Sequence, residues 1–432
     1  MLGFAVLGHC ERMGETTARW SLGKRLGFVF LAVYLCLAIV PDMLGIIPGV
    51  GDLWLGLWAA LMPVLGNAAF GIEDPIVVQV TGSGDMTWDW IRTFWLLVLA
   101  LVAAIAVVVI DRKGRDYAVW YARLRVLVRY SLALALFSYG FAKLTGNQFM
   151  PPGPLELTRT YGESSPMGLA WTFMGYSTAY MWFTGLAEVL GGALLLIRRT
   201  TTLGALVAAG VMANVVAINF CFDVPVKLYS SLLLGMAVFL AAHDARRLVD
   251  VLILGRTPAP AEPPPTRTRR LRIARVVAKS AFMVVLAGMV AMQVASVGEM
   301  AAMTTKGPLA GAWDVEALSV DGVERPASDA DRWRQIVIGE FPYVMVRPIR
   351  GEAFFLGYTH EADAGTLTLI DRRSGEPQNN ALAVEQTAPD QLVLRGPFAG
   401  TTIAVTLRRV DTEHMQLVTR GFHWVNEYPH NR

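Results

Sequence analysis

The sequence predicts a bundle of about seven membrane-spanning α-helices followed by a soluble antiparallel β domain. Long apolar runs recur up to about residue 298, and Lys and Arg cluster beside them. After residue 306, short stretches of alternating apolar and polar residues replace these runs. Of the 432 residues, 54% are hydrophobic and 17% are charged, against about 45–50% and about 25% in soluble domains. We therefore expect the lipid bilayer to surround part of this chain.

The membrane-spanning helices are predicted from apolar runs of about 20 residues, the length that crosses the hydrocarbon core. We expect them at about 26–48, 90–110, 124–144, 179–197, 203–221, 226–243 and 276–298. Basic pairs such as Lys24-Arg25 and Arg198-Arg199 mark the cytoplasmic ends, as the positive-inside rule predicts. This puts the N-terminus in the cytoplasm of a bacterium, the helices in its inner membrane and the C-terminal domain in the periplasm.

Between these runs, several shorter features have local meanings. Pro41-Asp42 predicts a kink or an early exit from the first helix. The stripe from Trp54 to Met62 is too short to span and suits either an interfacial helix or one packed on the bundle. Asp85 or Thr87 is expected to cap the following helix. Ser165-Pro166 is typical of a helix start, so we expect residues 167–176 to form a short helix over the mouth of the bundle.

The domain boundaries follow from changes in composition. We expect an N-terminal membrane domain at 1–254 with six of the helices, and a cytoplasmic Pro/Arg-rich linker at 255–275. The seventh helix then occupies 276–298, and the extracytoplasmic β domain occupies 306–432.

The β domain is predicted from nine alternating runs separated by turn residues such as Asp321-Gly322. These runs are Trp313–Val320, 334–338, 343–346, 353–358, 366–370, 382–384, 391–394, 402–407 and 416–424. Eight or so short strands at this spacing indicate an antiparallel barrel or a sandwich.

Two polar residues stand near the middle of predicted membrane helices. Glu188 lies about ten residues into the fourth helix, which is about 15 Å deep, and Asn214 lies at a similar depth in the fifth. An ionisable group at that depth is a functional-site candidate. In one interpretation Glu188 accepts a proton beside a bound ligand, and in the other it only hydrogen-bonds Asn214 across the helices.

A second group of polar residues is expected at the outer mouth of the bundle. Tyr139 and Lys143 are four residues apart on one helix face, and Asn219, Asp223 and Lys227 arrive at the same level. The two lysines would suit an anionic or carbonyl-bearing ligand. The alternative is a salt bridge from Asp223 to Lys143 or Lys227 that closes the bundle, and we favour this role for Asp223 alone.

Residues 120–250 resemble the DoxX-like membrane family. The resemblance rests on the segment from Tyr139 to Leu144, on Glu188 followed by Gly191-Gly192, and on the Arg-Arg-Thr turn before a Gly/Ala-rich helix. It implies a four-helix bundle and an association with quinone-linked or thiol-linked redox systems. A quinone-type ligand and other membrane redox subunits are the cofactor and partners that it implies. The chain has no pair of neighbouring cysteines, so a direct dithiol reaction is not expected.

The C-terminal domain resembles lipocalin-type barrels in its Gly311-Ala312-Trp313 segment at the start of the first expected strand. The resemblance implies either a binding site for a small apolar ligand or a rigid module. His423, Glu427 and His430 match no helical zinc spacing, because Pro429 prevents a helix there, so we expect no metal site.

Two functional classes remain. The first is a redox-associated membrane protein that binds a quinone or similar carrier in its bundle, as a subunit of a larger oxidoreductase. The second is a non-redox binding, transport or envelope-assembly protein whose working part is the β domain. A net charge of +3 without basic–aromatic runs excludes nucleic acid as the expected partner. The sequence shows no nucleophile–base arrangement, which favours an associated subunit over a stand-alone enzyme.

Overall fold

The structure is a computed structural model that describes residues 20–45, 47–111, 117–257, 269–303, 307, 309–339 and 341–430. It divides into two compact units. The first contains residues 1–137 and 187–266, and the second contains residues 138–186 and 267–432. Most of the expected linker, residues 258–268, lies outside the described residues.

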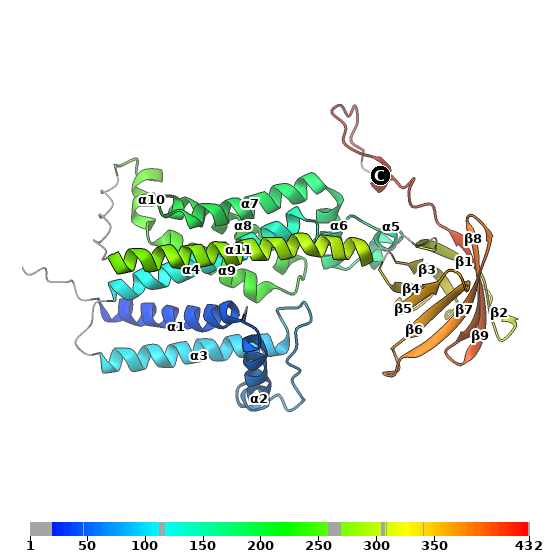
Figure 1. Ribbon diagram of the computed structural model, residues 1–432, viewed down its shortest axis with the longest axis horizontal. Helices are drawn as coiled ribbons and strands as arrows, with labels where there is room; N and C mark the ends of the chain where they lie inside the picture. Colours follow the sequence, from blue (N-terminus) through cyan, green and yellow to red (C-terminus); the bar gives the residue numbers. More distant parts are fainter. Residues whose placement is uncertain are drawn as a thin grey trace, which may run out of the picture. The chain divides into compact units, whose positions relative to one another are not determined.

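Helices form most of the chain before residue 304 (Figure 1). The long ones are α1 (Leu22–Leu44), α2 (Val50–Phe70), α3 (Thr87–Ile110), α4 (Ala118–Leu144), α7 (Thr178–Leu196), α8 (Thr201–Cys221), α9 (Lys227–Ala242) and α11 (Arg269–Met303). The short ones are α5 (Pro154–Leu157), η1 (Tyr161–Glu163), α6 (Pro166–Tyr176), η2 (Arg198–Thr200), α10 (Ala245–Leu252) and α12 (Gln416–Thr419).

Within the described residues, seven helices are long and apolar enough to cross a membrane: α1, α2, α3, α4, α7, α8 with η2, and α11. Helix α9 meets the same criterion only together with α10, which bends away from it by 71°. Helix α2 runs across α1 and α3 (Figure 1) and packs Trp58 and Met62 against Trp88 and Ile91. The stripe from Trp54 to Met62 therefore belongs to a helix that is long and apolar enough to cross a membrane, so the expectation that it is too short to span is wrong. Its packing on α3 agrees with the alternative of a helix packed on the bundle.

The first unit contains α8 and α9 together with the part of α4 up to Phe137 and the part of α7 from Ala187. The tandem glycines of α7 allow close packing on two sides, because Gly192 faces Phe137 of α4 and Gly191 faces Ala208 of α8. Near the start of α4, the ring centroids of Tyr121 and of Phe239 on α9 lie 5.7 Å apart. Small residues at helix interfaces let the backbones approach closely in an apolar solvent.

Several helix boundaries differ from the sequence-based expectation, and the end of α1 and the start of α11 have clear causes. Helix α1 ends at Leu44 instead of about 48, since Pro41 occupies its last turn and Gly45 donates to the Pro41 carbonyl. Helix α11 begins at Arg269, inside the linker expected to extend to 275. Arg, Leu and Ala in this stretch are good helix formers, so the helix continues beyond its apolar part.

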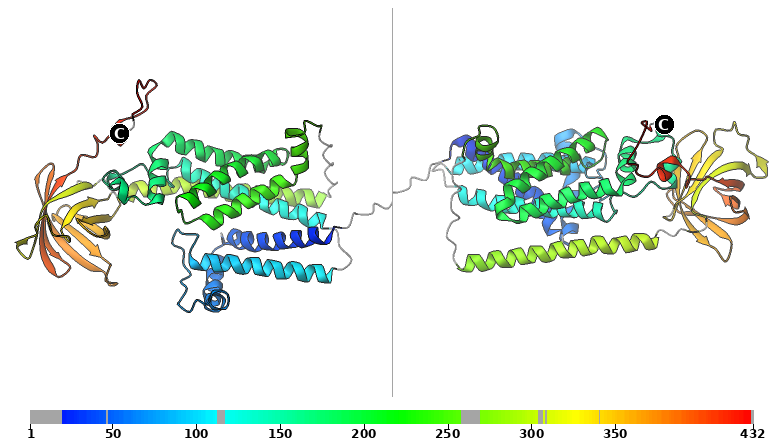
Figure 2. Two further views of the ribbon diagram at one scale, coloured as in Figure 1. Left: turned by 180° about the vertical axis from the view of Figure 1, so that it is seen from behind. Right: turned by 90° about the horizontal axis from the view of Figure 1, so that it is seen from above.

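The β domain is a closed antiparallel barrel in which most strands pair with the next along the chain (Figure 2). The strands are β1 (Gly311–Val320), β2 (Val323–Glu324), β3 (Trp333–Ile338), β4 (Tyr343–Pro348), β5 (Phe354–Glu361), β6 (Thr366–Asp371), β7 (Gln378–Ala388), β8 (Gln391–Phe398) and β9 (Thr401–Arg409). Pairing of β1 with β9 closes eight strands, and β2 only extends the β1 hairpin. The structure therefore decides for a barrel over a sandwich.

The barrel interior is filled with aliphatic and aromatic side chains. Trp313 is fully buried among them, and its indole N–H donates to the Leu309 carbonyl at 2.9 Å. The guanidinium of Arg409, on β9, lies 5.3 Å from the Trp313 ring centroid. Trp313 thus ties the first strand to the last.

The ninth expected strand, 416–424, is wrong: this stretch forms α12 and an irregular segment. Because β9 pairs with β1, the barrel has no free edge on which another strand could form.

We expect residues 306–432 to fold alone, since the barrel is closed and has its own core. The isolated segment should show a β-type circular-dichroism spectrum and a cooperative urea transition. Trp313→Ala should reduce its free energy of unfolding by about 3–5 kcal/mol, the cost of emptying a large aromatic core site. Val323→Ala, at an exposed position, should change it by no more than about 0.5 kcal/mol. A disordered spectrum of the unmutated segment would contradict the prediction.

Candidate functional site

Lys143 is a buried cation at the end of α4. The residue is only 5% exposed. The ammonium lies 5.8 Å from the ring centroid of Tyr139, one turn earlier, and 5.9 Å from that of Phe149. Both distances are within the range of cation–π attraction. The structure therefore brings together two of the candidate residues, Tyr139 and Lys143, and adds Phe149.

Helix α6, the short helix expected at 167–176, packs beside Phe149. Phe149 forms a buried cluster with Met174 and Met181, and its ring meets that of Trp171 at 5.1 Å. The N-terminus of α6 is capped by Ser165, whose hydroxyl accepts from the N–H of Gly168. The predicted helix start at Ser165-Pro166 is confirmed, and the helix holds the aromatic surroundings of Lys143 in place.

Close approach of α7 to α4 buries the face that carries Glu188. A Cβ atom at Gly185 would lie 2.9 Å from the Gly140 carbonyl oxygen and 3.0 Å from Cβ of Lys143. Gly192 is equally close to α4 at the Phe137 ring. Glu188 follows Gly185 by three residues and precedes Gly192 by four, so helical spacing places it on this same face. It is 2% exposed, as expected for an ionisable group inside a bundle.

Asn214 lies on the exposed surface of α8. The structure therefore does not form the expected hydrogen bond between Glu188 and Asn214. Depth along a helix gives the level of a residue but leaves its direction around the axis to the packing. Asn219, one further turn along α8, is buried and donates to the Ser230 hydroxyl at 3.0 Å. That bond links α8 to α9, which is a structural contact.

Asp223 and Lys227 form a salt bridge across the turn between α8 and α9, with 2.8 Å between carboxylate and ammonium. This matches the structural alternative for Asp223, whose side chain is 84% exposed. Lys227 also lies 3.8 Å from the carboxylate of Asp85, which precedes α3. The two lysines of the expected mouth have different surroundings: Lys227 lies beside the carboxylates of Asp85 and Asp223, and Lys143 lies beside the rings of Tyr139 and Phe149.

Asp85 has a role that the sequence did not indicate. Its carboxylate accepts from the backbone N–H of Lys227 at 2.7 Å and of Leu228 at 3.0 Å, so it caps α9. The expected cap of α3 is instead Asp89, whose carboxylate accepts from the N–H of Met86. The Gly-Ser-Gly-Asp turn predicted a capping residue, but only the fold shows which helix it caps.

A further polar network joins the loop after α4 to the barrel. Arg347, on β4, donates to the Thr158 carbonyl at 3.0 Å and to Gln335, which donates to Asp314. Arg334 pairs with Glu163 at 3.1 Å. Partial burial acts to raise the pKa of the Glu163 carboxyl. Hydrogen bonds from Thr160 and the guanidinium groups of Arg334 and Arg347 outweigh it and hold this pKa below its ordinary value. No sequence pattern identified these outward-facing residues.

The same loop is also tied to α11. The side-chain amide of Asn147 donates to the Gln293 carbonyl at 3.0 Å and to the Ser296 hydroxyl at 2.7 Å. The segment that follows Lys143 is thus attached both to α11 and to the outer face of the barrel.

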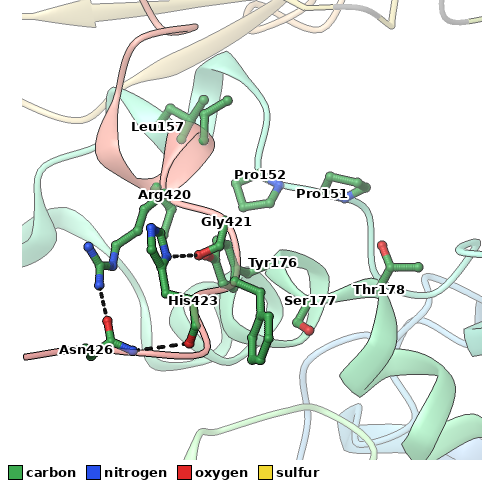
Figure 3. A pocket seen from close by; sticks show the side chains of 13 residues that line it. Pro151, Pro152, Leu157, Tyr176, Ser177, Thr178, Arg420, Gly421, His423 and Asn426 are labelled. Atoms are coloured by element: carbon green, nitrogen blue, oxygen red, sulfur yellow. Dashed lines mark hydrogen bonds between the residues drawn. The ribbon is translucent and has the colours of Figure 1, made fainter. Parts of the chain in front are cut away.

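A cleft of about 770 Å³ lies between this loop and the C-terminal segment (Figure 3). It is lined by Pro151, Pro152, Tyr176, Ser177 and Thr178 on one side and by residues from 417 to 426 on the other. Arg420 and Asn426 are hydrogen-bonded at its edge. His423 lines the cleft, but the described residues contain no group of three side chains able to hold a metal ion.

Seven helices of membrane-spanning length, followed by a closed β-barrel, define this chain as a multi-pass membrane protein with a β-barrel domain. The family model described as DoxX matches residues 124–222, from α4 to the end of α8. A Bacillus subtilis (strain 168) protein described as "Uncharacterized protein YwoB" is 39% identical over 137 residues, covering 30% of this chain and 87% of that protein. The chain belongs to the DoxX family. No solved structure matches it.

The ion pairs of Lys227 with Asp85 and Asp223 can be tested with a matched pair of isosteric variants. Asp85→Asn removes one of two carboxylate oxygens that accept from the start of α9, and we expect it to cost about 1–2 kcal/mol. Asp223→Asn removes only an exposed ion pair, worth about 0–1 kcal/mol, and Asn tolerates the left-handed backbone at this position (φ 50°). Thermal unfolding in mild detergent measures both. Equal midpoints for the two variants would show that Asp85 is not the stabilising partner.

Proposed function

We propose that this DoxX protein binds a small, flat, carbonyl-bearing ligand, best represented by a quinone headgroup, beside Lys143. The observation that carries the proposal is the buried ammonium of Lys143 near the rings of Tyr139 and Phe149. An ammonium donates hydrogen bonds to carbonyl oxygens, and aromatic rings stack on a flat headgroup. An ionisable residue buried at membrane depth is costly and is usually retained for function.

We further propose Glu188 as a proton-exchanging group within the helical bundle. It is buried, and it lies on the face of α7 that approaches α4 through Gly185 and Gly192. Reduction or oxidation of a quinone headgroup requires protons as well as electrons, so a carboxyl group at this depth suits such a ligand. We further propose that the electrons pass to or from a partner, with this chain as an associated subunit of a membrane oxidoreductase.

The packed interior of the barrel supports the proposal that the ligand binds in the helical bundle. Its interior is occupied by buried side chains, with Trp313, Leu382 and Leu407 among those that are fully enclosed. An eight-stranded barrel can hold either packed side chains or one small ligand, and this one holds side chains. The observation favours the helical bundle as the ligand-binding part and the barrel as a rigid module.

Lys143→Met tests the ligand site. Loss of a hydrogen bond to a charged group should weaken ligand binding by about 1.5–3 kcal/mol, or about tenfold to hundredfold. We expect the quinone content of protein purified in mild detergent, measured by mass spectrometry, to fall while thermal stability changes little. Lys227→Met is the matched control, which should lower stability and leave bound quinone unchanged. A large loss of stability in Lys143→Met without a specific loss of ligand would make Lys143 a structural residue.

We also propose that the barrel is periplasmic and the N-terminus cytoplasmic, as the basic flanks of the helices indicate. A reporter enzyme that is active only in the periplasm should be active when fused after Arg432. The same reporter should be inactive when it is fused at Pro260, between α10 and α11. The reverse pattern would show that the orientation is wrong.

A further inference from the structure

The chain after β9 exposes an unusual number of large apolar side chains. Four residues within seven positions are involved, and Trp424 is 92% exposed and Tyr428 is 83% exposed. The other two are Phe422 and Val425. The rings of Phe422 and Trp424 meet edge to face with 5.0 Å between their centroids. We call residues 420–428 the aromatic tail. Side chains of this size do not normally face water together, so the tail requires a partner.

The cleft of Figure 3 locates the tail against one end of a membrane helix. Its walls are Gly421, Phe422 and His423 of the tail and Tyr176, Ser177 and Thr178, which include the first residue of α7. Helix α7 is long and apolar enough to span the membrane, so its first turn lies at the membrane surface. The tail, which shares the cleft with that turn, lies at the same level.

The surfaces of α6 and α7 next to the cleft have the composition of a membrane interface. Phe173 and Tyr180 are exposed, with 5.4 Å between their ring centroids, and Trp182 and Phe183 are exposed one turn further on. Tyr and Trp concentrate where the apolar core of the bilayer meets the headgroups. The aromatic tail extends this belt from the helices to the end of the barrel domain.

Charge around the tail also favours a phospholipid surface. Arg420 belongs to the tail, and its guanidinium is exposed beside the cleft, where it donates to Asn426 at 2.7 Å. Glu427 is the one acidic residue between 420 and 428. A cation beside apolar aromatic side chains matches phosphate groups above acyl chains.

We propose that the aromatic tail inserts into the headgroup region of the membrane leaflet that faces the barrel. It thereby attaches the end of the barrel domain to the bilayer, in addition to the chain connection through α11. The occupant of this surface is the lipid itself. The inference does not depend on whether the bundle binds a quinone.

The test uses the full-length protein in lipid nanodiscs with one fluorescent probe. Trp424→Cys, in a chain whose Cys10, Cys36 and Cys221 are replaced by Ser, is labelled with an environment-sensitive dye. The matched control is Val323→Cys on β2, which is also exposed and lies on the side of the barrel away from α5 (Figure 1). Both positions are exposed, so neither substitution should disturb folding.

We expect the dye at position 424 to emit at a shorter wavelength in nanodiscs than the dye at 323. It should also be quenched several-fold more strongly by lipids that carry a spin label near the headgroup, and less by aqueous iodide. Equal iodide quenching at both positions, without lipid quenching at 424, would overturn the proposal. Position 424 could instead be protected from iodide only when a copurified protein is present, again without lipid quenching. That result would assign the tail to a protein partner and would equally overturn the proposal.

Discussion

The close approach of α7 to α4 is the constraint on which the site in the membrane depends. Gly185 and Gly192 leave no room for a side chain where they face the Gly140 carbonyl and the Phe137 ring. Without these glycines the two helices would separate, and the face between them would open to lipid or water. Glu188 lies on that face and Lys143 follows Gly140 by one turn. Their burial is therefore a consequence of two absent side chains.

The polar residues of the bundle divide into two kinds, and only the environment distinguishes them. Asn219 and Lys227 have partners on neighbouring elements that satisfy them: the Ser230 hydroxyl and the carboxylates of Asp85 and Asp223. Such contacts hold helix ends together where backbone groups would otherwise lack partners. Lys143 differs in being buried next to the aromatic rings of Tyr139 and Phe149, which attract a cation.

The loop after α4 contacts the barrel through hydrogen bonds and an ion pair. Asn147 connects the loop to α11, and Thr158 and Glu163 connect it to Arg347 and Arg334 on the barrel. Arg347 is buried, and a buried charge is costly to separate from its partners, so this contact holds the loop to the barrel. The loop also carries Phe149, so the contact with the barrel extends to the surroundings of Lys143.

The sequence by itself determined the fold class, because hydrophobic period and length depend only on local residue order. Apolar runs located the long helices, alternation located the eight strands that close the barrel, and Ser165-Pro166 located the start of α6. It also singled out Lys143 and Glu188 as candidates, since charges within apolar runs are rare, and both are buried. Only the tertiary structure decided that Asp85 caps α9, that Asn214 faces outward and that residues 416–424 form no strand. These outcomes depend on helix rotation, on loop docking and on closure of the barrel, which bring together residues far apart in the chain.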